Sequence, residues 1–225
     1  MPDDDPGAAP SAAPGPRPFA DDQATVRYNR GAGAGRRDGS RWGSAAGGHP
    51  EDPPGDPESV ARAICLRLLT VQPRTRAELA AALARRKVPG EAAAAVLGRF
   101  TEVGLIDDRA FAEAWVGSRH AGRGLARRAL AAELRRRGID GETVGEAVAA
   151  LDTETEERTA RALVARRLPS TRQLEPAVRI RRLVGMLARK GYPPALAVRV
   201  VGEQLAADGM DPRELDGFDD PMPEE

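Results

Sequence analysis

The sequence GLIDDRAFAEAWVGSRHAGRGLARRALAAELRRRGI, residues 104–139, decides the fold, because it contains one helical unit that recurs along the chain. Its pattern predicts two helices joined by a glycine-bearing bend at residues 122–124. The first begins at the paired aspartates 107–108, since carboxylates there can cap free amide groups. Phe111 and Trp115 lie one turn apart and predict its apolar face. We interpret Trp115 as a core residue rather than a platform for stacked bases.

The second helix of this unit is strongly basic. Leu130 and Leu134 predict its buried stripe, and Gly138 can adopt the left-handed conformation that commonly ends a helix. Arginines occupy the bend and many of the remaining positions. The unit is therefore expected to have an apolar inside and a basic outside.

The same pattern occurs three times along the chain. The segments ALARRKVP at residues 82–89, ELRRRGID at 133–140 and MLARKGYP at 186–193 align without gaps. Each has a leucine expected to be buried, a basic cluster, a helix stop, one apolar residue and a helix starter. A spacing of roughly 50 residues accommodates three helices per repeat. Lys87 stands where the other two repeats have glycine, so this helix is expected to end differently.

Other helix starts carry their own signals. Thr75 with Glu78, and Thr153 with Glu156, match the capping box, in which a hydroxyl and a carboxylate exchange hydrogen bonds with backbone amides. Cys65, the only cysteine, lies on an apolar helical stripe and is expected to be a buried thiol. An intrachain disulfide is excluded.

These signals predict an all-α protein of three tandem three-helix repeats, stacked into an elongated, curved bundle. The predicted repeats span residues 57–106, 107–152 and 153–208. A Pro/Gly-rich arm at 1–56 lacks helical or alternating periodicity, and we expect it to be disordered. The remainder, 209–225, is predicted to be an acidic disordered tail.

Charge is unevenly distributed although the net charge is zero. Residues 1–56 carry −3, residues 57–210 carry +9, and residues 211–225 carry −6. A basic body favours an anionic partner, and the acidic tail could fold back on it and weaken non-specific DNA binding. No apolar run of about 18 residues occurs, and the N-terminus lacks a signal-peptide pattern. We therefore expect a cytoplasmic protein with no membrane partner.

The residue inventory argues against an enzyme. The only histidines are His49 and His120, too few for a His/Cys metal cluster. Neither a phosphate-binding P-loop nor a dinucleotide-binding glycine fingerprint occurs. We interpret the aspartates at 107–108 as helix caps rather than metal ligands. No catalytic residue, metal or cofactor is predicted.

Clustered arginines are the main functional signal. If the repeats stack in register, these side chains form a discontinuous basic stripe on one side, suited to DNA phosphates or an acidic protein surface. The alternatives are a solvated helix face, or a helix-turn-helix DNA-binding regulator in which one recognition helix reaches base edges. The candidate contact residues are Arg119, Arg123, Arg127, Arg128, Arg135, Arg136, Arg182 and Arg189.

With these motifs the chain resembles the RecX family over roughly residues 57–207. The resemblance rests on GLIDD at 104–108, FA at 111–112, SR at 118–119, EL at 133–134 and GI at 138–139, with RKGY at 189–192 downstream. It implies tandem three-helix repeats.

The resemblance also implies a function. Members of this family regulate the RecA recombinase: they bind RecA filaments on single-stranded DNA and inhibit ATP hydrolysis, filament growth and strand exchange. They are not enzymes, and they act in homologous recombination, DNA repair and the SOS response. The expected partner is the RecA filament, with single-stranded DNA as a further candidate contact, and we expect the chain to be a monomer.

Overall fold

The computed structural model describes residues 56–211. The expectations for the arm at 1–56, except its last residue, and for most of the tail at 209–225 therefore concern residues outside the described part. Residues 56–211 form α-helices and one 3-10 turn, without a strand, as predicted. The elements are α1 (Pro57–Val71), α2 (Arg76–Arg85), α3 (Gly90–Glu102), α4 (Asp108–Arg123), α5 (Arg127–Arg136), α6 (Gly141–Ala149), α7 (Thr153–Arg167), η1 (Leu168–Thr171), α8 (Pro176–Arg189) and α9 (Pro194–Ala207).

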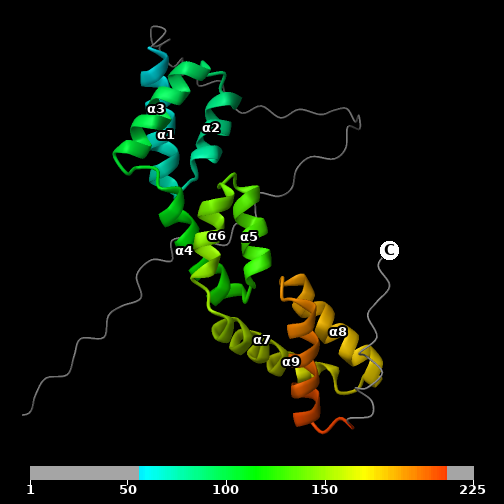
Figure 1. The fold of residues 1–225 in the computed structure, drawn as a ribbon. Coiled ribbons are helices and arrows are strands. Elements are labelled where there is room, and N and C mark those ends of the chain that lie inside the picture. The colour runs from blue at the N-terminus through cyan, green and yellow to red at the C-terminus, as the bar shows by residue number, and fades with distance from the viewer. Residues whose placement is uncertain (1–55, 212–225) are drawn as a thin grey trace, which may run out of the picture.

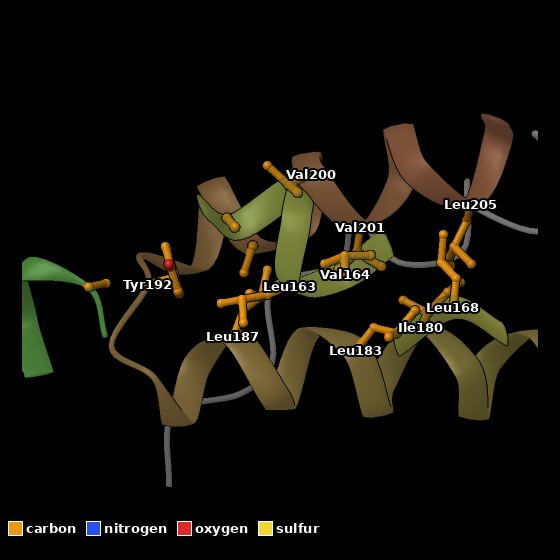
Figure 2. Packing of buried hydrophobic residues seen from close by; sticks show 13 residues of the cluster. Leu163, Val164, Leu168, Ile180, Leu183, Leu187, Tyr192, Val200, Val201 and Leu205 are labelled. Carbon is orange, nitrogen blue, oxygen red and sulfur yellow. The ribbon is translucent and has the colours of Figure 1, made fainter. Parts of the chain in front are cut away.

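Three groups of three helices follow one another along an elongated molecule (Figure 1), which confirms the predicted fold class. Each group has its own apolar cluster. In the third, Leu183 and Leu187 of α8 pack with Val164 of α7 and Val201 of α9 (Figure 2). All four side chains are fully buried, because the apolar residues of each helix recur at helical spacing and face one centre.

The first joint, between repeats 1 and 2, is made by the start of α2 and the end of α5. The Thr75 hydroxyl donates a hydrogen bond to the carbonyl of Arg137 (2.8 Å), and the Arg76 amide donates to the Asp108 carboxylate (2.8 Å). Arg137 also pairs with Glu78. The first turn of α2 thus finds partners for its free polar groups in the next repeat.

The second joint, between repeats 2 and 3, reproduces this arrangement. The amide of Ala126 donates to the carbonyl of Lys190 (2.9 Å), and the amide of Arg127 donates to Glu156 (2.9 Å). Tyr192, almost fully buried, donates its hydroxyl to the carbonyl of Gly124 (3.1 Å). Figure 2 shows this tyrosine at the end of the third cluster that faces repeat 2. The repeats are therefore linked by directed hydrogen bonds as well as by packing.

Left-handed residues end the second helix of every repeat. Lys87, Gly138 and Gly191 have φ of 59°, 80° and 88°, so the expectation that α2 ends differently at Lys87 was wrong. Gly138 needs glycine because a Cβ would overlap the Cβ of Ala77, and at Gly191 it would lie 2.5 Å from the backbone nitrogen of Ala129. Among the described residues no repeat precedes the first one, so a side chain fits at Lys87.

Of the two predicted capping boxes, one is present in the structure and the other is not. Thr75 and Glu78 form the predicted capping box at the start of α2. The box expected at Thr153 and Glu156 was wrong, because Asp152 is the cap of α7 and accepts the amide of Thr155 (2.6 Å). Glu156 is instead free to reach α5 across the second joint. The aspartates at 107–108 cap two helices: Asp107 caps α4, and its neighbour caps α2 of the preceding repeat.

Replacing Gly191 with Ala should open the second joint, because the new Cβ meets backbone atoms and the left-handed conformation is unfavourable for alanine. We expect the free energy of unfolding to fall by about 2–4 kcal/mol in urea titrations followed by circular dichroism. The matched variant Lys87→Gly should change it by less than about 1 kcal/mol. Equal effects at the two positions would contradict the close approach at the joint.

A second prediction concerns pH. The carboxylate of Asp208 accepts hydrogen bonds from Arg172 (2.7 Å) and Arg179, which lower its pKa from an ordinary 3.8 to about 2. A lowered folded-state pKa adds stability that is present above pH about 4 and is lost as the pH falls toward 2. Asp208→Asn should therefore melt below the wild type at pH 7, and the gap should shrink across this window. A gap that stays constant in melts down to pH 2.5 would exclude an ionic contribution.

Candidate functional site: a cationic groove at the second joint

The second joint brings α5 beside the end of α8, and a hollow of about 490 Å³ lies between them. Arg128 and Arg136 of α5 line it from one side, and Arg189 of α8 from the other. Glu133 is its acidic lining residue and already accepts a hydrogen bond from the Trp115 indole (2.9 Å). Positive charge therefore predominates in this hollow.

A second hollow, of about 530 Å³, lies between α7 and α8. Arg166 and Arg167 line it from α7, Arg182 from α8, and Lys190 follows α8 directly. Because Arg189 lines both hollows, they adjoin. We name the combined surface the cationic groove, defined by Arg128, Arg136, Arg166, Arg167, Arg182, Arg189 and Lys190.

No arginine of the groove forms an ion pair with a carboxylate of residues 56–211, a property shared by some exposed arginines elsewhere, such as Arg62 and Arg67. Arg199, by contrast, pairs with Glu157 (2.6 Å) and with Glu203 (3.1 Å). Guanidinium groups that share a concave surface without counter-charges raise the local positive potential. Their planar forks suit bidentate contacts to phosphate or carboxylate oxygens.

The surroundings of Lys190 are consistent with a positive potential in the groove. Its Nζ donates to the carbonyl of Arg123 (2.6 Å), where α4 ends. Burial lowers the pKa of Lys190, and the nearby guanidinium groups of Arg166 and Arg123 lower it further. An anion that enters the groove would therefore relieve repulsion between existing charges.

Four of the eight predicted contact residues lie in the groove: Arg128, Arg136, Arg182 and Arg189. All four are exposed. Arg135 is also exposed on α5 but lines neither hollow, and Arg123 is half-buried, with its backbone carbonyl bonded to Lys190.

Arg119 and Arg127 have structural surroundings instead. Arg119 is only 6% exposed, and its guanidinium lies 4.1 Å from the centroid of the Trp115 ring, which also has the guanidinium of Arg137 at 3.9 Å. Cation–π contacts of this kind stabilise a core, and the interpretation of Trp115 as a core residue is confirmed. Arg127 is bonded to Glu156, which is 1% exposed, with Nε–Oε2 and Nη2–Oε2 distances of 3.0 and 2.9 Å.

Three groove residues were absent from the predicted set: Arg166, Arg167 and Lys190. A usable signal existed, because the two adjacent arginines end a helix just before Pro169, where cations also complement the helix dipole. The repeat alignment covered only the second helix of each repeat, whereas this hollow lies between a first and a second helix. Neither hollow includes the basic cluster of repeat 1, so a stripe across all three repeats stays a prediction.

Two other features are absent from the described part of the chain. Residues 56–211 contain no group of three or more His, Cys, Asp or Glu side chains placed to hold a metal ion. In the same range no helix has the length and apolar character needed to cross a membrane.

The different surroundings of neighbouring arginines predict different mutational effects. Arg127→Ala would leave the buried Glu156 carboxylate without its charged partner, so the free energy of unfolding should fall by about 2–4 kcal/mol. Arg128→Ala removes an exposed, unpaired cation and should change it by less than about 0.5 kcal/mol. Urea titration of both variants tests this, and equal stabilities would refute the structural role of Arg127.

Comparisons with known proteins agree with this architecture. Family models of the first, second and third three-helix domains of RecX match residues 61–100, 107–148 and 154–201. The chain is 58% identical to "Regulatory protein RecX" of Thermobifida fusca over 189 residues, which cover 84% of this chain and 95% of the relative. It is 60% identical to "Regulatory protein RecX" of Streptomyces coelicolor over 169 residues, 74% of this chain and 90% of the relative.

Among solved structures, the crystal structure of RecX from Lactobacillus salivarius has the same fold. The TM-score is 0.62 at 17% identity, over 67% of this chain and 98% of that one. A second crystal structure, of regulatory protein RecX, gives a TM-score of 0.60 at 21% identity. With three matched domains in the order of the three repeats, and relatives of this identity, the chain belongs to the RecX family of regulatory proteins.

Proposed function

We propose that this chain is a non-enzymatic regulator of the RecA recombinase in the cytoplasm. In this proposal it binds RecA filaments on single-stranded DNA as a monomer and inhibits ATP hydrolysis, filament growth and strand exchange. Family membership supports the regulatory role. The observation that supports a contact surface is the cationic groove, in which six unpaired arginines and a lysine lie around the second joint.

The groove suits the chemistry of a nucleoprotein filament. Such a filament offers phosphates along its DNA and carboxylates on its protein surface, and arginine forks can donate paired hydrogen bonds to either group. Binding to phosphates would release condensed counterions, so affinity should fall steeply with salt. The groove alone supplies enough cations for several such contacts.

The shape of the molecule also suits an extended partner. The three repeats lie in series (Figure 1), and the hydrogen bond from the Ala126 amide to the Lys190 carbonyl holds the start of α5 against the end of α8. A pre-organised surface loses less entropy on binding than a flexible one. An elongated body that carries the groove at one joint can contact several successive subunits of a filament.

The helix-turn-helix alternative fits the geometry less well. A DNA-reading regulator of that class places one recognition helix in the major groove. Here the clustered cations come from α5, α7 and α8, so no single helix carries them. This distribution favours contacts to a charged backbone or protein surface over readout of bases.

Measurement of DNA-dependent ATP hydrolysis by RecA, together with filament length, tests the proposal. We expect inhibition at substoichiometric to equimolar ratios of this chain. The double variant Arg182→Ala/Arg189→Ala should raise the half-inhibitory concentration about tenfold, because two unpaired groove cations are lost.

The matched control is Arg62→Ala/Arg67→Ala, which removes the same charge from exposed positions on α1, outside the groove. It should shift inhibition by less than about twofold. Equal losses in the two double variants would refute the groove as the contact surface. Unchanged hydrolysis and filament length with the wild type would refute the regulatory function, and sequence-specific binding to duplex DNA would favour the alternative.

A further inference from the structure

One face of α8 connects the groove to the end of the described chain. Arg179, Arg182, Met186 and Arg189 follow at spacings of three, four and three residues, so they form a single stripe. Arg182, Met186 and Arg189 line the second hollow. Arg179, at the other end of the stripe, is buried and paired with Asp208.

Asp208 shows that C-terminal carboxylates already bind arginines of this region. It follows α9 directly and also pairs with Arg172 (2.7 Å). The described chain ends three residues later, at Asp211. The chain therefore continues within a few residues of the pair formed by Asp208 and Arg179, and Arg179 lies one helical turn from Arg182.

The sequence that follows is complementary in charge to the groove. Residues 212–225, PRELDGFDDPMPEE, contain six carboxylates and one arginine. We propose that this segment lies along the arginine stripe of α8 and covers the cationic groove of its own chain. It thereby competes with anionic partners, and this regulatory consequence rests on the proposed function, whereas the contact itself does not.

The dimensions permit this contact. Arg179 and Arg189 are ten residues apart on a helix, a rise of about 15 Å. Fourteen residues span up to roughly 45–50 Å when extended, so the carboxylates of Asp219, Asp220, Glu224 and Glu225 can all reach the groove. Tethering gives the segment a high effective concentration. Exposed ion pairs are individually weak, so a filament with many phosphates can displace it.

The chain offers a direct test, because Lys87 and Lys190 are its only lysines. Lys190 lines the groove, whereas Lys87 is exposed at the end of α2 in repeat 1. A carbodiimide joins an amine to a carboxylate only when the two are in contact. Mass spectrometry of the treated monomer should identify an amide between Lys190 and the segment 212–225, and none between Lys87 and that segment. A product found only in dimers would assign the groove to a second copy, and equal linkage to both lysines would overturn the proposal.

Binding to a fluorescent single-stranded oligo(dT) gives an independent measurement without RecA. A chain truncated after Asp211 should bind about tenfold more tightly than the full chain at low salt, and the difference should vanish at high salt. A full-length variant with Asp219→Asn, Asp220→Asn, Glu224→Gln and Glu225→Gln should behave like the truncation. This control separates loss of charge from loss of chain length.

The arginine stripe supplies the decisive comparison. In an Arg182→Ala/Arg189→Ala background, truncation should change oligo(dT) affinity by less than about twofold, because the segment has lost its binding surface. The same tenfold gain in that background, or no gain in the wild type, would overturn the proposal. Inhibition of RecA without the Lys190 linkage or the truncation effect would leave the proposed function intact and refute the covering segment. The Lys190 linkage and the truncation effect without inhibition of RecA would support the covering segment and refute the proposed function.

Discussion

The close approach of successive repeats at Gly138 and Gly191 is the constraint on which the rest of the structure depends. At both positions the absence of a Cβ lets the end of one helix contact the first turn of a helix in the preceding repeat. The carbonyl just before each glycine then accepts a hydrogen bond from the residue that caps that helix. One backbone conformation thus satisfies the polar groups of two helix ends and sets the relation between repeats.

The same joint explains where charge accumulates. Cations are favoured near helix C-termini because they complement the helix dipole, and the basic clusters of α7 and α8 follow this rule. Docking of the α8 end onto α5 adds Arg128 and Arg136 to these cations. A local preference that normally leaves cations spread over a surface therefore produces a concentrated groove. The groove is a consequence of stacking and not a property of one helix.

Arginine has three distinct roles in repeats 2 and 3. Arg119 stacks on an aromatic ring in the core, Arg127 neutralises a buried carboxylate, and Arg189 faces solvent without a counter-charge. The first two stabilise the fold, and the third is available to a partner. The anion binding that we propose thus depends on which guanidinium groups the fold leaves unpaired.

The sequence by itself determined the helical class, the threefold repeat, the buried stripes of leucine and valine and the family. These features depend on spacing and on caps within a few residues, such as Thr75 with Glu78, so local chemistry is sufficient to predict them. Only the tertiary structure decided which arginines are free. Arg127 meets Glu156 across 29 positions of sequence and Arg137 meets Glu78 across 59, and a local pattern carries no information about partners so distant. The misassigned cap at Thr153 has the same origin, because Glu156 bonds to the neighbouring repeat and not to its own helix start.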